Sequence, residues 1–150
     1  MTKNKVMEII QDCIENSRAA VLASVDHNGH PDMRWVTPGC VRERFDAIYI
    51  VSESHFSKVK QLTENPAATM MFQTVALDKV ITVYGKVNII TAPSIIAETL
   101  ECVGKHLHAF WNLKHGKRDL VVVEFLIEHA RFYHPLNGSM EIVKFGSEES

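Results

Sequence analysis

The stretch that decides the fold is residues 51–72, VSESHFSKVKQLTENPAATMMF. An apolar strand leads into it, and Lys58 follows three serines at the start of a short amphipathic helix. Asn65 and Pro66 end this helix, because the residue before a proline is pushed out of the α region. A second apolar strand, residues 67–72, follows directly.

The serines and the lysine of this stretch suit a phosphate group. Ser52 and Ser57 supply hydroxyls around the start of the helix. The free N–H groups and the dipole of a helix favour an anion at that place. The alternative is an ordinary helix cap with a lysine on the surface. The remainder of the chain bears on this choice.

Outward from this stretch, the hydrophobic pattern predicts two more helices and several strands. The helices are expected over residues 4–16 and from 93 to 107, and the strands over residues 19–25, 32–37, 47–51, 79–90, 120–133 and 140–145. Asn28-Gly29 predicts a hairpin turn, and Gly85 predicts a bulge. Strands joined by short turns pair antiparallel, and about six of them can curl into a small barrel. The predicted class is therefore mainly β, with flanking helices.

Composition is typical of a globular chain, with 150 residues, 46% hydrophobic and 23% charged. We expect one domain, 1–150, in which 139–150 is a C-terminal extension with a frayed end. A net charge of −2 gives no case for broad nucleic-acid binding, and no run is long enough to span a membrane. Three widely spaced cysteines without a secretory signal favour reduced thiols in the cytoplasm.

An ordered set of short motifs carries a resemblance to a known family. They are the turn at 26–31, Arg34, the run 57–59 with Leu62, Asn65-Pro66, the strand end at 83–85 and the final strand to Tyr133. In order and spacing the chain resembles the pyridoxamine 5′-phosphate oxidase-like FMN-binding split barrels. It looks closest to their short general stress protein branch. The resemblance implies a six-stranded antiparallel split β-barrel.

The resemblance also implies a homodimer that holds FMN in a groove between the two barrels. Carried over by position, the cofactor-binding residues are Arg34 and Lys58 at the phosphate, the backbone of Trp35, Val36 and Thr37 along the isoalloxazine, and Ser52 near the phosphate or ribityl chain. Ser57 beside Lys58, and Gln73 and Thr74 at the end of the fourth strand near the ring edge, are further candidate cofactor-binding residues. An arginine supplies a planar fork of donors and a lysine a point charge, which together suit a phosphate.

Each of the two tryptophans has two alternative roles. Trp35 and Trp111 are either packing residues or flavin contacts, and Trp111 lies in a segment that can lean over the partner's flavin.

Ser57 stands where the true oxidases usually carry an arginine, so one phosphate contact is missing. The chain also ends without the section that grips the vitamin substrate. The resemblance therefore implies flavin binding rather than pyridoxamine oxidation.

The expected chemistry belongs to the flavin, because no acid–base pair stands out in the sequence. One hypothesis is an FMN-dependent oxidoreductase that takes hydride from a reduced nicotinamide nucleotide; its catalytic residues and substrate are unknown. The alternatives are a non-catalytic flavin- or haem-binding module and a cofactor-free dimeric stress protein. His106, His108 and His115 keep haem open, but without a carboxylate or cysteine at familiar spacing we expect no metal site.

Overall fold

The computed structural model describes residues 1–41, 44–103 and 119–146. The described elements are α1 (Lys3–Ser17), β1 (Ala20–Val25), β2 (Pro31–Val36), β3 (Ala47–Glu53), α2 (Ser57–Glu64), β4 (Ala67–Gln73), β5 (Val80–Ile90), α3 (Pro93–Val103), β6 (Leu120–His134) and β7 (Ser139–Lys144). The predicted order of helices and strands is confirmed. The end of the predicted second long helix, including Leu107, lies outside the described residues.

All the strands belong to one antiparallel sheet in the order β2-β1-β4-β5-β6-β3, with β7 paired to β6. An isolated bridge between Gly39 and Tyr49 links the segment after β2 to β3, at the two ends of this order. The sheet curls without closing, which is the predicted split barrel of the α+β class. The described residues form seven strands, because 139–144 of the expected C-terminal extension pair with β6 as β7.

Two glycines occupy the positions that their neighbours require. Gly29 has a φ of +84° in the turn between β1 and β2, where Asp26 Oδ1 accepts a 2.9 Å hydrogen bond from the Asn28 N–H. Gly85 lies at a register shift between β5 and β6, which confirms the predicted bulge. A Cβ at Gly85 would overlap the backbone oxygen of Leu126, so only glycine fits there.

The core lies inside the barrel and under α1. The buried side of α1 consists of the residues that recur at helical spacing in the sequence, namely Val6, Ile9, Ile10, Cys13 and Ile14. They pack with inward residues of β1, β4 and β5 such as Leu22, Met70 and Val83. A smaller cluster around Tyr49 and Val122 lies with Ile96 and Cys102 of α3.

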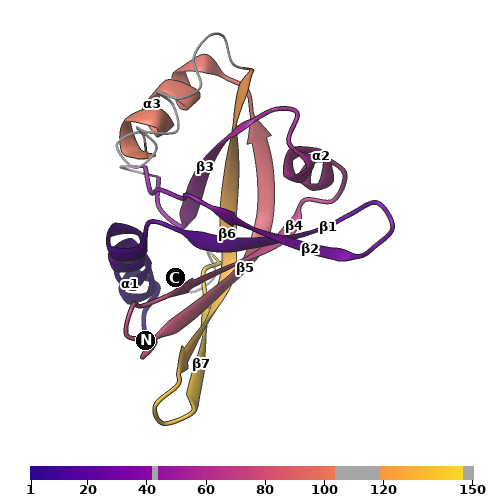
Figure 1. Cartoon of the computed structure of the whole chain (residues 1–150). Helices are drawn as coiled ribbons and strands as arrows, with labels where there is room; N and C mark the ends of the chain where they lie inside the picture. The colour runs from indigo at the N-terminus through magenta and orange to yellow at the C-terminus, as the bar shows by residue number, and fades with distance from the viewer. Residues whose placement is uncertain (42–43, 104–118, 147–150) are drawn as a thin grey trace.

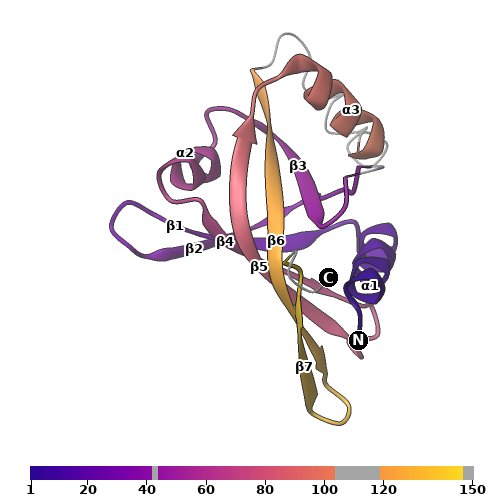
Figure 2. The ribbon, with the colours of Figure 1, turned by 180° about the vertical axis from the view of Figure 1, so that it is seen from behind.

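The helices are distributed around the barrel rather than stacked in a layer. Figure 1 shows α1 and α3 on one side and α2 on the other, and Figure 2 shows the same separation from behind. β5 and β6 run through most of the height of the molecule, and the β6–β7 hairpin projects at the lower end. No described helix is both long and apolar enough to cross a membrane.

Candidate functional site

Arg34 is the first sequence-predicted site residue that the structure places in a cluster. It lies on β2 directly opposite Leu22 of β1, so its side chain is on the same face of the sheet as the buried Leu22. Its Nη1 donates hydrogen bonds to the Leu22 carbonyl oxygen at 3.1 Å and to Ser24 Oγ at 2.8 Å. Burial lowers the pKa of Arg34, while the nearby Asp32 acts in the opposite direction.

Gln61 of α2 connects the helix to this arginine. Its Oε1 accepts hydrogen bonds from Arg34 Nη2 at 3.2 Å and from Ser24 Oγ at 2.5 Å. Its Nε2 donates to Asp32 Oδ2 at 3.1 Å, and the same carboxylate oxygen lies 3.2 Å from Arg34 Nη2. The four side chains form one network, which holds the guanidinium in a fixed orientation between sheet and helix.

Lys58, one turn earlier on α2, adds a second cation to the cluster. Burial lowers the pKa of Lys58, and the positive charge of Arg34 lowers it further. Its Nζ lies 4.7 Å from the ring centroid of Phe56. Within 1–41, 44–103 and 119–146, no carboxylate lies within ion-pairing distance of this amine. Lys58 is therefore a half-buried cation beside another cation, an arrangement that a bound anion would stabilise.

The serines of the opening stretch have different surroundings. Ser57 is the exposed first residue of α2, and the residue before it, Phe56, provides no side-chain cap. The ordinary side-chain cap that was the alternative interpretation is therefore absent from the helix start. Ser52 is buried on β3, where its Oγ donates to the carbonyl oxygen of Glu53 at 3.1 Å. It makes no hydrogen bond to the Arg34 network among the described contacts.

The other β2 residues alternate between the two faces of the sheet. Val36 is buried on the inner face and Thr37 is half-buried just after the strand. Met33 and Trp35 point outward, with exposed fractions of 68% and 82%. β2 stands at one end of the strand order, so its backbone has a neighbour, β1, on one side only along this sheet.

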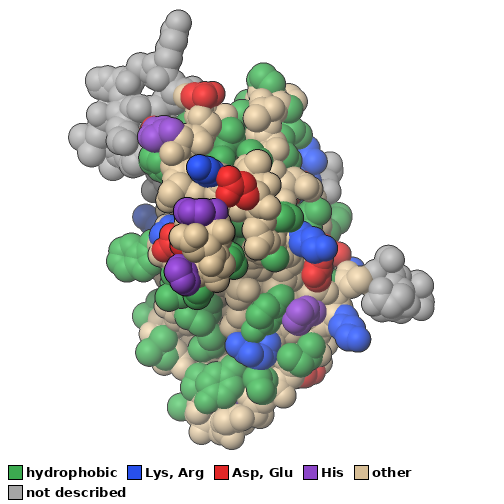
Figure 3. Space-filling model, turned by 90° about the vertical axis from the view of Figure 1, so that its right-hand side faces the viewer, with side chains coloured by type: hydrophobic (Ala, Val, Ile, Leu, Met, Phe, Trp, Pro, Cys, Tyr) green, Lys and Arg blue, Asp and Glu red, His purple; other side chains and the backbone are tan. Residues whose placement is uncertain are grey.

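An apolar outer face continues from β2 across the sheet. The cross-strand registers align Trp35, Val21, Met71, Thr82, Arg131 and Ile142 in one row. Tyr133 and Met140 face each other in the next row between β6 and β7, and both are exposed. Figure 3 shows hydrophobic side chains gathered around a basic side chain in the lower part of the molecule, the level at which Figure 1 places β7.

A groove of about 380 Å³ lies on the outer face of the sheet, along β1, β4 and β5. Its lining includes Ala23, Thr69 and Tyr84, which lie in one cross-strand row on the face opposite to Arg34. The Tyr84 ring stacks on His129 with centroids 4.6 Å apart. The groove therefore has an aromatic wall, and its lining does not include Arg34, Lys58 or Gln61.

Gln73 and Thr74 lie at the end of β4 away from α2. Gln73 is exposed and pairs with Val80 of β5. Thr74 Oγ1 accepts a hydrogen bond from the Asp78 N–H at 3.1 Å and donates to Asp78 Oδ1 at 2.6 Å, which ties it into the β4–β5 turn. The structure does not bring either residue to Arg34.

Two sequence predictions concern residues outside the described ranges. Trp111 and the segment 106–115, with its three histidines, lie outside the described residues. In the described part of the chain, no group of three or more histidine, cysteine, aspartate or glutamate side chains could hold a metal ion.

Ser24, Asp32 and Gln61 are the site residues that the sequence prediction missed. Gln61 stands three positions after Lys58, which places the two on neighbouring positions of one helix surface. Ser24 and Asp32 are directly opposite each other in the β1–β2 hairpin. Helical spacing and hairpin register thus contained the signal, but the contact between the two elements required the fold.

Fold and site together define an antiparallel split barrel with a cationic cluster where β2 meets α2. The family model described as pyridoxamine 5′-phosphate oxidase matches residues 6–134. The chain therefore belongs to the pyridoxamine 5′-phosphate oxidase family. A search of curated proteins gives no match.

Solved structures show the same fold at low sequence identity. A pyridoxamine 5′-phosphate oxidase-related, FMN binding protein from Nostoc punctiforme has a TM-score of 0.74 at 14% identity, covering 95% of this chain and 92% of that one. A Clostridium acetobutylicum protein related to general stress protein 26 has a TM-score of 0.74 at 15% identity, covering 99% of both chains. A heme binding protein from Mycobacterium smegmatis has a TM-score of 0.62 at 17% identity, covering 85% of this chain and 52% of that one.

Proposed function

We propose that the protein binds FMN, with the phosphate held between Arg34 and Lys58. The observation that carries this proposal is Lys58, a half-buried cation whose pKa is lowered by burial and by Arg34. An anion placed between the two would remove their mutual repulsion and compensate for the lost hydration of the amine. Membership of a family with FMN-binding relatives supports a flavin phosphate as that anion.

Arg34 and Lys58 have different roles in the proposed site. The network of Ser24, Asp32 and Gln61 fixes the guanidinium, so little side-chain entropy is lost when a phosphate binds. Asp32 competes with the phosphate for Arg34, because its carboxylate already lies 3.2 Å from Nη2. Lys58 has no such competitor among the described residues, and it therefore supplies the uncompensated charge.

The proposed position of the isoalloxazine is along β2. Backbone groups of Trp35, Val36 and Thr37 on the side away from β1 can pair with the donors and acceptors of the pyrimidine ring. Arg34 would hold the phosphate on the inner side of β2, and the β2 backbone would hold the ring. The cofactor groove would be completed by a second copy of the chain.

A homodimer is the assembly that fits the outer face. Trp35 and Met33 on β2 and Ile142 and Met140 on β7 are exposed apolar residues on the same face of the sheet, with Thr82 and Arg131 in the row between them. Contiguous exposed apolar surface on a folded protein marks an interaction site, and burying it between two copies is the simplest closed arrangement. We propose that this surface is the subunit interface and forms one wall of the cofactor groove.

The proposed activity is electron transfer through the bound flavin. The chemistry that FMN would supply is electron transfer from a reduced nicotinamide nucleotide to an acceptor. The contribution of the chain is to bind and orient the cofactor. Arg34 and Lys58 hold its phosphate, and the β2 backbone orients its ring.

The test is the absorbance spectrum of the purified protein, followed by FMN titration of Arg34→Ala and Lys58→Ala. Each variant should lose about tenfold or more in affinity, since a charge-assisted hydrogen bond contributes about 1.5–3 kcal/mol. The control is Lys60→Ala, an exposed lysine on the same helix. Riboflavin, which lacks the phosphate, should bind all four proteins equally. Unchanged FMN affinity in both site variants would exclude this phosphate site.

A haem-binding module is the second candidate, because one of the similar structures is described as a heme binding protein. Reconstitution with haemin separates the two candidates. A Soret band together with no uptake of FMN would favour haem, and flavin absorbance without a Soret band would favour the first proposal.

A further inference from the structure

A cavity of about 540 Å³ lies between α1, the segment after β2 and the end of α3. It is on the side of the molecule that carries α1 and α3, away from α2 and its cationic cluster. Two thiols, Cys40 and Cys102, line it, and both also line a neighbouring cavity of about 340 Å³. The protein thus has two cysteines at one place, although they are 62 positions apart in the chain (102 − 40).

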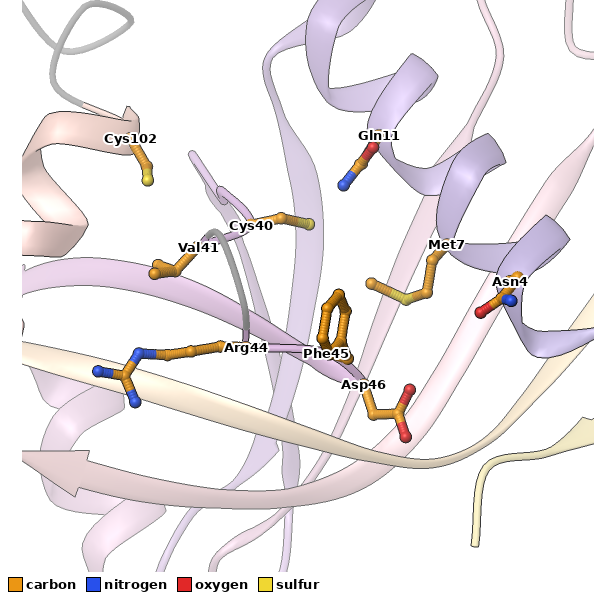
Figure 4. A pocket seen from close by; sticks show the side chains of 9 residues that line it. All are labelled: Asn4, Met7, Gln11, Cys40, Val41, Arg44, Phe45, Asp46 and Cys102. Carbon is orange, nitrogen blue, oxygen red and sulfur yellow. The ribbon is translucent and has the colours of Figure 1, made fainter. Parts of the chain in front are cut away.

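Close packing between these two segments brings the thiols together. A Cβ at Gly39 would lie 4.0 Å from Cys102 Cβ, and it would overlap Val103. Cys40 is the next residue, and consecutive Cα atoms are about 3.8 Å apart. Figure 4 shows the Cys102 sulfur pointing toward the segment of Cys40 and Val41, while the Cys40 sulfur is turned toward Gln11. A bond between the sulfurs requires the Cys40 side chain to rotate away from Gln11 and toward Cys102.

The surroundings give the two thiols different reactivities. Burial raises the pKa of Cys40 to about 11, and nearby Cys102 contributes in the same direction. A thiol with a raised pKa is a poor first nucleophile at neutral pH, because little of it is thiolate. Both thiols are partly exposed, and Cys102 is assigned the first attack because the raised pKa of Cys40 disfavours its thiolate. The third cysteine, Cys13, is buried in the core under α1 and lines neither cavity.

We propose that Cys40 and Cys102 form a reversible disulfide when the protein meets hydrogen peroxide. The Cys102 thiolate attacks one peroxide oxygen, the O–O bond breaks, and a sulfenic acid and hydroxide form, the hydroxide taking up a proton to become water. Cys40 then attacks that sulfur; the S–S bond forms, the S–O bond breaks, and the proton of Cys40 leaves with the hydroxyl group as water. The two thiols lose two electrons, and one peroxide becomes two waters.

The bridge would connect the end of the β2 segment to α3. A cross-link between residues 40 and 102 restricts the unfolded chain over more than a third of its length, and it should raise the temperature of unfolding. It would also fix the chain just after Trp35–Thr37. The proposal is independent of FMN, because neither cysteine belongs to the Arg34–Lys58 cluster.

The experiment treats the full-length reduced protein with hydrogen peroxide and then blocks the remaining thiols with N-ethylmaleimide under denaturing conditions. Trypsin separates the three cysteines into peptides 6–18, 35–42 and 87–105. We expect peptides 35–42 and 87–105 to be recovered as one species, lighter than their sum by two hydrogen atoms and separated again by dithiothreitol. Only peptide 6–18 should carry the maleimide label, and the oxidised protein should unfold several degrees higher.

Three variants test the assignment. Cys40→Ser and Cys102→Ser should each abolish the linked peptide and the rise in unfolding temperature, while Cys13→Ala should retain both. A sulfinic acid at Cys102 with Cys40 still free, a bridge that involves Cys13, or disulfide-linked dimers on a non-reducing gel would each overturn the proposal.

Discussion

The side chain of Arg34 on β2 is tied to Gln61 on α2 by a hydrogen bond of 3.2 Å from Nη2 to Oε1. The same amide group is hydrogen-bonded to Ser24 on β1 and to Asp32 on β2, so one glutamine connects α2 to both strands of the hairpin. A guanidinium held in this way is oriented before any ligand arrives. Lys58 lies three positions earlier on the same helix, and the positive charge of Arg34 contributes to lowering the pKa of its amine.

Replacing Gln61 with alanine should weaken FMN binding about fivefold, because one hydrogen bond that positions Arg34 contributes about 1 kcal/mol. Fluorescence quenching of the flavin on titration measures this change. Lys60→Ala, on the exposed side of the same helix, should bind like the original chain. If the two variants have equal affinities, Gln61 does not position the arginine.

FMN affinity should fall at alkaline pH because Lys58 loses its proton below its ordinary pKa of 10.5. The free energy of unfolding should change with pH in the opposite direction to the FMN affinity. Without ligand, the unfolded lysine stays protonated up to its ordinary pKa, while the folded one is neutral earlier, so this group makes the folded state more stable as pH rises between the two values. Dissociation constants between neutral pH and pH 10 measure the effect, and Lys58→Arg should flatten the profile. An unchanged slope in Lys58→Arg would assign the titration to another group.

A charge on the outer face should separate the proposed dimer. Trp35→Glu and Ile142→Glu each place a carboxylate on the apolar surface, and light scattering should show a monomer. Phe45→Glu is the matched control, since Phe45 is 82% exposed like Trp35 but lies outside the sheet. If the dimer persists in Trp35→Glu and Ile142→Glu but is lost in Phe45→Glu, the interface lies elsewhere.

Tyr49→Phe should lower the free energy of unfolding by about 1–1.5 kcal/mol. Tyr49 is 1% exposed, and its hydroxyl donates a 2.7 Å hydrogen bond to Glu124. Burial and this carboxylate raise the pKa of Tyr49 far above its ordinary value. Its contribution to stability is therefore present below pH 10 and decreases as pH rises above that, which urea unfolding at several pH values can follow. Tyr133→Phe, at an exposed position, is the control.

Gly85→Ala should destabilise the protein by more than about 3 kcal/mol, because its Cβ would overlap backbone rather than a side chain. Gly39→Ala meets the side chain of Val103, which can shift, and it should cost less. Thermal unfolding of the two variants gives the comparison. Equal losses would mean that the bulge at Gly85 can relax.

Most of the fold could be predicted because its signals are local. The stripe Val6, Ile9, Ile10, Cys13 and Ile14 has helical spacing, and the same residues form the buried side of α1. The Asn28-Gly29 turn predicts the β1–β2 hairpin from two residues. The ordinary helix cap that was the alternative interpretation of this stretch does not form, since Phe56 occupies the cap position without a side-chain hydrogen bond and Ser57 begins the helix. Sequence patterns locate helix ends only to within a residue or two.

The candidate site was predictable only in its charged members. Arg34 and Lys58 stand out because a cation next to apolar segments needs a partner. Gln61 has no feature in the sequence that predicts a site residue, since a polar residue on an amphipathic helix usually faces water. Thr74 looked like a ligand contact by its place after β4, but its hydroxyl closes the turn with Asp78 instead.

By itself the sequence determined the order of helices and strands, the hairpin turn, the bulge and the cation on each of two separate elements. These follow from short-range rules of periodicity, backbone freedom and charge. The tertiary structure alone decided that Gln61 meets Arg34, that Lys58 lies beside the same guanidinium, and that Cys40 and Cys102 share a cavity. Such contacts depend on how the curled sheet brings distant segments together, which no spacing within one segment can specify.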